Sequence, residues 1–547
     1  MNFKVNESET KLRGGYYTPD LIACFLAKWA LAKKPSSMLE PSCGDGSFIR
    51  AIGTVCKHRL QLTGVELLPE EAEKARKASA KIRGTKTSIY SGDFIEWAIE
   101  KLNTGVSFDS VVGNPPYIRY QYLEAKDQEL SEALFKRYDL SFTKHTNAWV
   151  PFVIASVGLL APGGRLAMVI PSEILHVLHA GSLRKFLLAE CLEILMIDPS
   201  ELLFEDALQG TVLLMLEKKV SPEIASKGVC ILPMSNNEFL NLDPDSITSS
   251  ASYVSGDVLN GKWMKVMLDS DELEVFEKVR RIPTIRRFKD IASVDVGIVT
   301  GANKFFLVDD ATITRFNLEA FARPMFGRSE HCPGIIYDKA VHKANRKRGL
   351  PTNFVMFGKE DISELPPGAR EYIRYGEEQE LAGRYKCRIR KPWYSVPSIY
   401  TTPIGMLKRS HNFPRLILNS AGAYTTDTAY RISTTVPGIS AEQLVFSFIN
   451  SLTALTAELE GRHYGGGVLE LVPSEIEKLV VPLGNTKGFD LASLDKMIRQ
   501  NTDPDTLFDS QDAIVLKAAG LTKKEWTTIH WAWQRIRSRR HRLIIED

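Results

Sequence analysis

The chain has 547 residues, too many for one hydrophobic core, which indicates about two to four domains. Its 44% hydrophobic and 25% charged residues are typical of a globular protein, and its seven scattered cysteines, without a C-x-x-C pair, argue against a disulfide framework or a zinc cluster. The net charge of +3 is unevenly spread, because residues 1–250 carry 27 basic and 30 acidic side chains and residues 251–547 carry 42 and 36.

The first 220 residues alternate short apolar runs with helical patterns, which predicts a doubly wound, mostly parallel α/β sheet of the Rossmann-like kind. The expected strands are Ser37–Glu40, Gln61–Glu66, Thr87–Tyr90, Ser107–Val112, Arg165–Pro171, Glu193–Asp198 and Thr211–Glu217. The expected helices are Leu21–Lys33, Ser47–Arg59, Pro69–Arg83, Phe94–Leu102, Trp149–Leu160 and Leu183–Leu188. Such sheets bind ligands beyond the carboxyl ends of their strands.

A polar stretch at 242–260, rich in Ser, Asp and Pro, is expected to be a linker. It divides a catalytic domain, 1–245, from a second α+β domain, 246–547. The second domain has short β-like runs at Ile298, Phe305–Val308 and Arg415–Asn419, a return to helix and strand over 438–485, and a basic helix over Lys523–Ile545. The polar N-terminus is not a signal peptide, and no membrane span is expected.

A glycine-rich turn follows the first expected strand. Gly44 and Gly46 allow a ligand to approach the backbone closely, and the helix beginning near Ser47 offers free N–H groups to an anion. A simple tight turn is the alternative interpretation. A nicotinamide dinucleotide would need the fuller G-x-G-x-x-G/A turn, whereas Ile49 occupies the third position here, so a nucleoside without phosphates, S-adenosylmethionine, fits better.

Acidic residues follow the next two strands. Glu66 stands about 20 residues beyond the glycines, where a carboxylate can accept both hydrogens of a ribose diol. Asp93 could accept from an adenine amino group, and Phe94 could lie against the adenine face. Asp93 could equally cap the helix that begins at Phe94, and the two roles are compatible.

The segment Asn114-Pro115-Pro116-Tyr117 follows the fourth strand. The side-chain carbonyl of Asn114 and the backbone carbonyl of Pro115 can accept the two hydrogens of an exocyclic NH2 group, and the prolines hold these acceptors in place. Tyr117 can stack on a flat heteroaromatic ring. An ordinary Pro-Pro turn is the alternative.

The ordered set of 14–19 (Gly-Gly-Tyr-Tyr-Thr-Pro), 40–46 (Glu-Pro-Ser-Cys-Gly-Asp-Gly), Glu66, 93–94 and 114–117 resembles the gamma-class N6-adenine DNA methyltransferases of bacterial type II restriction–modification systems. The resemblance covers about residues 10–220, including the segment Asn147–Ile174. Two glycine-rich stretches, 297–303 and 463–469, resemble the target-recognition domains of the same family more faintly.

The resemblance implies a role for each matching residue. Cofactor binding falls to Thr18, Glu40, Gly44, Gly46, Glu66, Asp93, Phe94 and Phe152, and catalysis falls to Asn114, Pro115, Tyr117 and Phe204. Phe204 would pack on the target base, although a core phenylalanine is an equal alternative. No metal is implied.

The resemblance further implies methyl transfer from S-adenosylmethionine to N6 of an adenine flipped out of double-stranded DNA. The expected partners are the DNA and a separate restriction endonuclease, and the protein is expected to be a monomer in the bacterial cytoplasm. An RNA adenine or a protein glutamine methyltransferase is the alternative, and a non-catalytic nucleic-acid binder is a more distant one. Basic stretches at Lys343–Arg348, Arg384–Trp393 and Lys523–Arg542 are candidate phosphate contacts or simply solvated faces.

Overall fold

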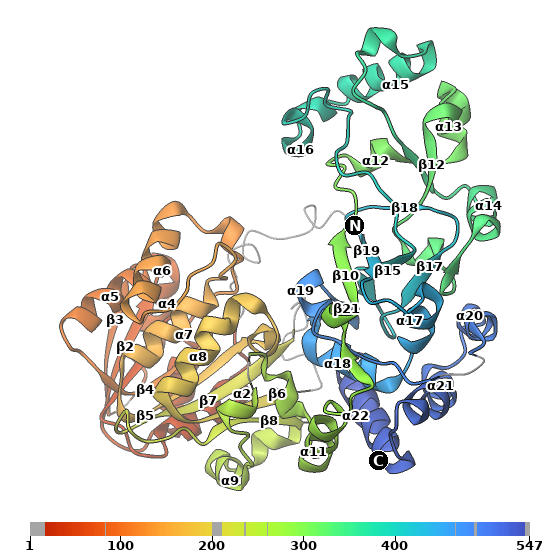
Figure 1. Ribbon diagram of the computed structural model, residues 1–547. Helices are drawn as coiled ribbons and strands as arrows, with labels where there is room; N and C mark the ends of the chain where they lie inside the picture. Colours follow the sequence, from red (N-terminus) through yellow and green to blue (C-terminus); the bar gives the residue numbers. More distant parts are fainter. Residues whose placement is uncertain are drawn as a thin grey trace. The chain divides into compact units, whose positions relative to one another are not determined.

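The computed structural model describes residues 17–82, 84–199, 210–234, 237–259, 261–464, 466–485 and 489–541. These residues form two compact units (Figure 1). The first contains Met267 and the described residues before it, and the second runs from Leu268 to His541. The functions expected for residues 1–245 and 246–547 stay predictions.

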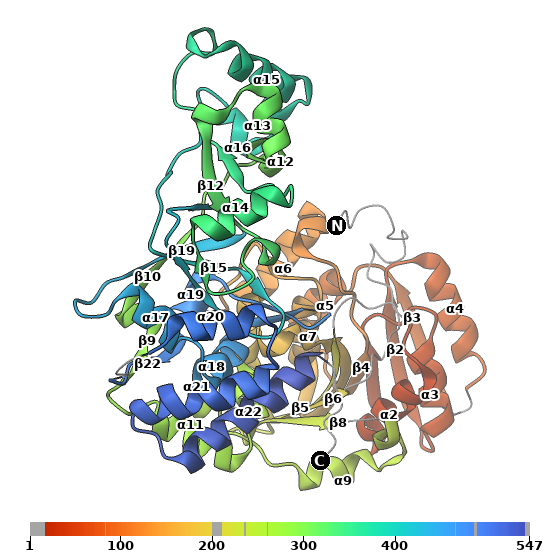
Figure 2. The same cartoon turned by 90° about the vertical axis from the view of Figure 1, so that its right-hand side faces the viewer.

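An eight-stranded sheet forms the centre of the first unit, in the order β3-β2-β1-β4-β5-β7-β6-β8 (Figures 1 and 2). The first five of these strands are parallel, and β7 runs antiparallel to both of its neighbours. The prediction of a mainly parallel α/β sheet is confirmed. The strands are β1 (Ser37–Glu40), β2 (Leu60–Glu66), β3 (Thr85–Ser91), β4 (Phe108–Gly113), β5 (Leu160–Pro171), β6 (Cys191–Pro199), β7 (Thr211–Lys218) and β8 (Gly228–Met234).

Helices cover both faces of this sheet, which explains why its central strands are buried almost throughout. α2, α3 and α4 share an apolar core with one face of the sheet. A second group is formed by α7, which contacts α5, α8 and β5, and by α8, which contacts β6. The helices are α2 (Asp20–Leu31), α3 (Ser47–Val55), α4 (Pro69–Ser79), α5 (Phe94–Asn103), α6 (Ala125–Arg137), α7 (Trp149–Gly158), α8 (Gly181–Glu190), α9 (Pro244–Ser250) and α10 (Gly256–Leu259).

All seven expected strands and all six expected helices are present, although several have other bounds: α4 ends at Ser79 rather than Arg83, and β5 begins at Leu160 rather than Arg165. The helix expected to reach Arg59 ends at Val55, because Cys56 turns to extended backbone ahead of β2. Helix α6 and strand β8 were not predicted. Helix α6 buries only Ser131, Leu134 and Phe135, so its apolar pattern is sparse.

The expected linker at 242–260 is wrong, because this stretch folds onto the first unit. Asp243 caps α9 by accepting from the Ser246 N–H at 3.1 Å, and Pro244 occupies the first turn. The Trp29 indole N–H donates to the Thr248 hydroxyl at 3.1 Å and joins α9 to α2. The polar residues that suggested a linker therefore form a helix start and a buried contact.

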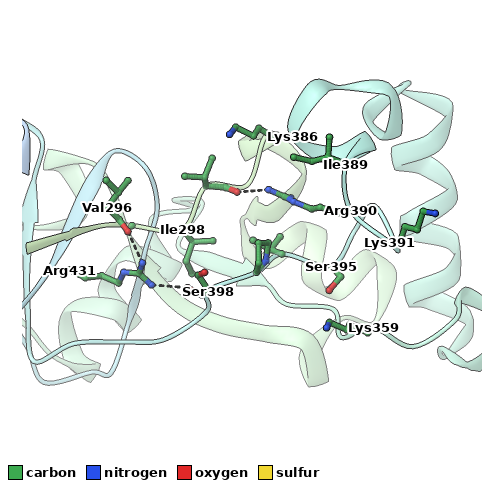
Figure 3. A pocket seen from close by; sticks show the side chains of 14 residues that line it. Val296, Ile298, Lys359, Lys386, Ile389, Arg390, Lys391, Ser395, Ser398 and Arg431 are labelled. Atoms are coloured by element: carbon green, nitrogen blue, oxygen red, sulfur yellow. Dashed lines mark hydrogen bonds between the residues drawn. The ribbon is translucent and has the colours of Figure 1, made fainter.

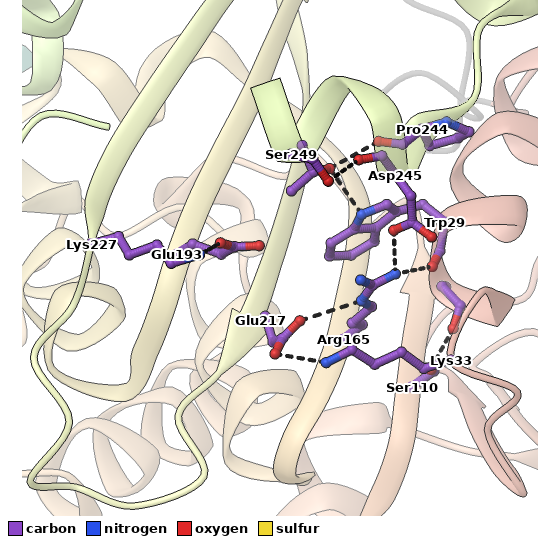
Figure 4. A network of polar contacts seen from close by, with 12 residues as sticks. Trp29, Lys33, Ser110, Arg165, Glu193, Glu217, Lys227, Pro244, Asp245 and Ser249 are labelled. Carbon is purple, nitrogen blue, oxygen red and sulfur yellow. Dashed lines mark hydrogen bonds and ion pairs between the residues drawn. The ribbon is translucent and has the colours of Figure 1, made fainter. Parts of the chain in front are cut away.

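A polar network centred on Arg165 joins α9, α2 and the sheet (Figure 4). The Arg165 guanidinium lies 4.7 Å from the Trp29 ring centroid and donates to Asp245 at 2.7 Å and to the Trp29 carbonyl at 3.0 Å. It also pairs with Glu217 at 3.4 Å, and Glu217 in turn pairs with Lys33 at 2.7 Å. These contacts involve β5, β7, α2 and α9 and hold them together.

The second unit contains several small mixed sheets, the largest being five-stranded with the order β10-β19-β15-β17-β13. Its strands are β9 (Ile285–Arg287), β10 (Ala292–Val296), β11 (Leu307–Val308), β12 (Ala322–Phe326), β13 (Ile336–Tyr337), β14 (Asn353–Val355), β15 (Ile404–Leu407), β16 (Arg409–Ser410), β17 (Leu416–Asn419), β18 (Tyr424–Thr425), β19 (Ala429–Thr434), β20 (Arg462–Tyr464), β21 (Val468–Glu470) and β22 (Val480–Pro482).

The second unit also contains helices. They are α11 (Ser270–Val279), α12 (Asn303–Phe306), α13 (Asp310–Phe316), α14 (Lys339–Lys347), α15 (Pro367–Glu378), α16 (Tyr385–Arg388), α17 (Ala441–Ser447), α18 (Ser451–Glu460), α19 (Pro473–Ile476), α20 (Leu491–Arg499), α21 (Pro504–Ala518) and α22 (Lys523–His541). The β-like run expected at Phe305–Val308 is half wrong, because Phe305 and Phe306 end α12. Across the described parts of both units, no helix combines the length and apolarity that crossing a bilayer requires.

Candidate active site

The predicted site residues follow the carboxyl ends of four adjacent parallel strands. β1 ends at Glu40, β2 at Glu66, β3 at Ser91 and β4 at Gly113. Strands β1 to β3 extend the sheet in one direction, and β4 returns to pair with the other side of β1. The order of strands therefore reverses between β1 and β4, which is where open α/β sheets bind their ligands.

The glycine-rich turn between β1 and α3 is tight. Gly44 and Gly46 have φ values of +46° and +86°, and the Gly46 N–H donates to the Cys43 carbonyl at 2.8 Å. A Cβ atom on Gly46 would lie 3.0 Å from the Cβ of Ala78 in α4. Both the backbone conformation and the packing at position 46 favour glycine, and the N-terminus of α3 opens toward the strand ends.

Glu66 holds this turn against β2. Its two carboxylate oxygens accept from the Gly44 N–H at 2.8 Å and the Leu68 N–H at 2.9 Å. Each oxygen of a carboxylate has more than one acceptor site, so Glu66 can make these bonds and still accept from a ligand hydroxyl. The ribose role assigned to Glu66 from the sequence stays a prediction, and its structural role in shaping the turn is additional.

Glu40 is the most unusual carboxylate of the site. It is 1% exposed, and its Oε2 atom has no hydrogen-bond partner among the described residues. Burial raises the pKa of Glu40 well above its usual value, the charges of Asp45 and Glu66 raise it further, and only Arg50 opposes them. A buried acid without a cationic partner is costly when ionised, and a bound cation would remove that cost.

Asp93 and two aromatic rings follow β3. The Asp93 carboxylate accepts from the Glu96 N–H at 2.8 Å, which confirms the capping role for α5. Burial raises the pKa of Asp93, although its bonds to backbone N–H groups act in the opposite direction. The Phe94 ring lies 4.9 Å from the Phe152 ring of α7, so two of the residues assigned to the adenine pocket are neighbours.

The turn after β4 is fastened to its surroundings on both sides. The Ser42 hydroxyl donates to the backbone carbonyl of Asn114 at 2.9 Å, which links this turn to the glycine-rich one. A Cβ on Gly113 would lie 3.2 Å from the Pro41 ring, so the two turns pack closely. The Tyr117 hydroxyl donates to the Val169 carbonyl of β5 at 3.1 Å, which fixes one end of its ring.

Asn147 is a structural support of this turn that the sequence did not reveal. Its side-chain oxygen accepts from the Tyr120 N–H at 3.2 Å, and its side-chain nitrogen donates to Glu173 at 3.1 Å. Alongside it, the Ala148 N–H donates to the Ile118 carbonyl at 2.9 Å. The segment after Tyr117 is thereby joined to the start of α7 and to the turn after β5.

Of the remaining predicted site residues, some are described by the structure and others are not. Thr18 is 5% exposed, and the Tyr17 ring lies 3.9 Å from the position of a Cβ on Gly44, so this segment lies beside the glycine-rich turn. Residues 14–16 of the Gly-Gly-Tyr-Tyr-Thr-Pro segment and Phe204 lie outside the described residues.

Two of the three basic stretches contain arginines that pair with acids of the second unit. In α14, Arg346 pairs with Asp310 at 2.7 Å. In α22, Arg537 pairs with Asp505 at 3.5 Å, and Arg535 pairs with Glu272. The α22 stretch, expected as a DNA contact or a solvated face, is therefore in good part a structural helix of its unit.

Comparison with known proteins shows which methyltransferases the chain is similar to. Residues 54–204 match the family model described as Eco57I restriction-modification methylase, and residues 260–516 match that of the C-terminal domain of the type II methyltransferase M.Eco57I. The chain is 22% identical to the type II methyltransferase M.AccI of Acinetobacter calcoaceticus over 537 residues, which cover 94% of each chain. It is 23% identical to M.XamI of Xanthomonas campestris pv. amaranthicola, over 86% of this chain and 85% of that one.

A solved structure agrees with the fold. The type IIL restriction-modification enzyme MmeI, determined in complex with DNA, aligns with a TM-score of 0.58 and 11% identity, over 94% of this chain and 74% of MmeI. The two family models describe the two parts of one kind of enzyme, and together they take in most of the chain on both sides of the division between the units. Both matched parts of the chain are similar to the Eco57I methylases, and the chain is a DNA methyltransferase of a type II restriction-modification system.

Proposed function

We propose that this protein transfers a methyl group from S-adenosylmethionine to N6 of an adenine flipped out of double-stranded DNA. The methylation would be site-specific and would protect the site from a cognate restriction enzyme. The observation that carries the proposal is the Asn114–Tyr117 turn, anchored at the end of β4 and joined through Ser42 to the glycine-rich turn. It offers two acceptors for an exocyclic amine and an aromatic ring beside them.

The residues at the ends of β1 and β2 fit S-adenosylmethionine, the methyl donor that the family implies. The ligand carries an ammonium group, and Glu40 is a buried carboxylate with an oxygen that lacks a partner in the described structure. Gly44 leaves room against the backbone, Gly46 allows the turn to pack on α4, and Glu66 and Asp93 supply acceptors for hydroxyl and amino groups. When bound, S-adenosylmethionine supplies an electrophilic methyl group on its sulfonium.

Asn114 and Pro115 would act on the target amine. Their carbonyl oxygens accept the two N6 hydrogens, which concentrates the nitrogen lone pair and directs it toward the methyl carbon. Because the C–N bond forms as the C–S bond breaks, the extra proton on nitrogen can leave to water afterwards. The acceleration comes from positioning and preset dipoles, and no strong base is needed.

Tyr117 would hold the flipped base. Extruding a base costs a few kcal/mol, and stacking on an aromatic ring returns about 1–3 kcal/mol. The hydrogen bond from Tyr117 to Val169 keeps the ring fixed, so little side-chain entropy is lost when the base arrives. Phe204 stays a second candidate for this stacking.

The second part of the chain, 246–547, would recognise the DNA sequence. The protein would work as a monomer alongside a separate endonuclease. An RNA adenine or a protein glutamine is the alternative acceptor, since each also presents an NH2 group on a planar carbon.

The test is transfer of tritiated methyl from S-adenosylmethionine to unmethylated bacterial DNA, followed by digestion and separation of nucleosides. Label is expected in N6-methyladenine. Label in cytosine products, or in RNA or protein but not DNA, would overturn the assignment of the acceptor.

The matched variants are Asn114→Ala, Asn114→Asp and Asn103→Ala. Asn114→Ala is expected to lower kcat by a factor on the order of 10²–10³ while affinity for cofactor and DNA is retained. Asn114→Asp keeps an acceptor and should retain more activity than the alanine variant. Asn103→Ala, at the end of α5, controls for loss of an exposed asparagine and should leave kcat unchanged.

A further inference from the structure

A hollow of about 600 Å³ in the second unit is lined by cations (Figure 3). Its lining residues include five basic side chains and no acidic one. They are Lys359, Lys386, Arg390, Lys391 and Arg431. Residues 296–299, at the end of β10 and just beyond it, also line it. We call this feature the basic hollow.

The two arginines of the basic hollow are held by carbonyls rather than by acids. Arg431 is 6% exposed and donates to the carbonyls of Ser398 at 2.8 Å and Val296 at 2.7 Å. Its Nε atom has no hydrogen-bond partner among the described residues. Its cross-strand neighbour on β10, Asp295, instead accepts from the Tyr400 hydroxyl at 3.1 Å.

Arg390 repeats this arrangement on the opposite wall. It donates to the carbonyls of Val299 at 2.6 Å and Thr300 at 2.7 Å, and burial lowers its pKa. The Arg431 guanidinium also lies 3.6 Å from the centroid of the Tyr400 ring, but within the described structure neither Arg390 nor Arg431 forms an ion pair with a carboxylate. Two such groups facing one hollow make it a site of positive potential, which an anion would neutralise.

The three lysines lie on the exposed rim. Within the described structure, none of Lys359, Lys386 and Lys391 has a carboxylate within 4.0 Å. Beside them, the Tyr385 ring is 64% exposed and lies 5.6 Å from the Lys386 nitrogen. This contrasts with α14 and α22, where several arginines pair with acids of the same unit.

We propose that the basic hollow binds backbone phosphates of the substrate DNA. The inference rests on the proposed function and adds the residues that would hold the duplex. Lys386 and Lys391 would each contact a phosphate from the rim, while Arg390 and Arg431 provide a fixed positive field beneath. Phosphate contacts release counterions and position the duplex without reading its sequence.

The test compares two double variants of equal charge. Lys386→Gln/Lys391→Gln removes two rim cations, whereas Lys496→Gln/Lys517→Gln removes two exposed cations from α20 and α21, outside the three basic stretches. Binding of a fluorescent random-sequence duplex is followed by anisotropy at several salt concentrations. Each lost phosphate contact lowers the salt slope by about one, so the loss of affinity between about 50 and 200 mM salt should shrink roughly tenfold in the rim variant.

The Lys496→Gln/Lys517→Gln control should keep the wild-type slope, and Lys386→Arg/Lys391→Arg should keep it as well because the charges remain. An unchanged slope in the rim variant, or an equal decrease in both glutamine variants, would overturn the assignment. ATP serves as a second probe, because it carries phosphates that are not part of DNA. If the rim variant loses tight ATP binding but keeps its affinity for DNA, the hollow binds a free phosphate ligand instead. DNA methylation by the wild-type protein is measured in parallel. If the wild type methylates adenine in DNA but the rim variant keeps its salt slope, this inference fails and the proposed function stands.

Discussion

Two buried glutamates, one in each unit, show how the same residue type can have opposite consequences. Glu40 and Glu458 are each 1% exposed. Glu40 has a raised pKa and an oxygen without a partner in the described structure. Burial alone would also raise the pKa of Glu458, but the charge of Arg540 and the bonds from His463 and Arg540 outweigh it and bring the pKa to about 2.

The difference lies in what surrounds each carboxylate. Arg540 donates to both oxygens of Glu458, at 2.7 and 2.9 Å, and also to the carbonyls of His411 and Gly467. Glu40 has only Asp45 and Glu66 as close charges of its own sign, with Arg50 opposing. A buried charge that the chain itself compensates is structural, whereas one that the chain leaves uncompensated indicates a ligand.

The largest expected effect comes from breaking the compensated site. Arg540→Met leaves the buried Glu458 with only His463 as a partner, and we expect a loss of about 3–5 kcal/mol in the free energy of unfolding. Urea denaturation measures it. Lys524→Met on the exposed start of α22 is the control and should change stability little. A loss below about 1 kcal/mol would mean that this pair behaves like a surface ion pair.

The uncompensated site should respond in the opposite way. Glu40→Gln removes a buried charge, so the protein without cofactor should gain roughly 0.5–2 kcal/mol of stability at neutral pH. The same change should weaken S-adenosylmethionine binding by about 1.5–3 kcal/mol, because a charged acceptor is lost. Thermal unfolding and titration calorimetry provide the two readouts. Unchanged affinity would show that Glu40 does not bind the cofactor.

The pH dependence of the two variants sharpens the contrast. Glu458 has a lowered folded pKa, so its stabilisation is present above its unfolded value near 4.5 and is lost as pH falls toward about 2. Glu40 has a raised folded pKa, so its contribution is favourable below 4.5 and is lost as pH rises through the folded value.

Glu458→Gln should therefore lose most stability above about pH 4.5 and progressively less as pH falls toward about 2, whereas Glu40→Gln should gain stability only above about pH 4.5. Unfolding of both variants and the wild type by urea between about pH 2 and 8 tests this. Differences that do not depend on pH would show that packing, rather than charge, distinguishes the two sites.

The smallest effect is expected from Arg50, the cation whose charge opposes the pKa rise of Glu40. Arg50 is paired with Asp45 at 2.9 Å and is partly exposed, so its influence is screened. Arg50→Gln should weaken cofactor binding by about 0.2–1 kcal/mol, and more at lower pH, where Glu40 is protonated more readily. Calorimetry at two pH values distinguishes this from a uniform loss.

The sheet of the first unit was predictable because its candidate site residues come directly after its strands in the sequence. The segments after Glu40, Glu66, Ser91 and Gly113 each combine a strand end with residues suited to a ligand, and parallel pairing brings such ends to one edge. Periodicity along the chain therefore predicted the sheet and the strand ends that the candidate residues follow, and their roles stay predictions.

Contacts between distant segments could not be predicted in the same way. Arg540 and Glu458 are 82 residues apart, and nothing local to either indicates the other. The support given by Asn147 to the turn after Tyr117 depends on the packing of α7 beside β5. The short strands of the second unit, many of two to four residues, carry too little periodicity to be located from sequence.

Helix α9 has a practical consequence for dissecting the enzyme. A catalytic fragment cut at residue 245 would end inside the first turn of α9, lose Thr248 and expose the Trp29 indole to water. It would also weaken the hold of Asp245 on Arg165, which lies against the same indole. A fragment that ends at Met267, where the first unit ends, keeps the helix and its contacts and is the better choice for isolating the methyl-transfer half.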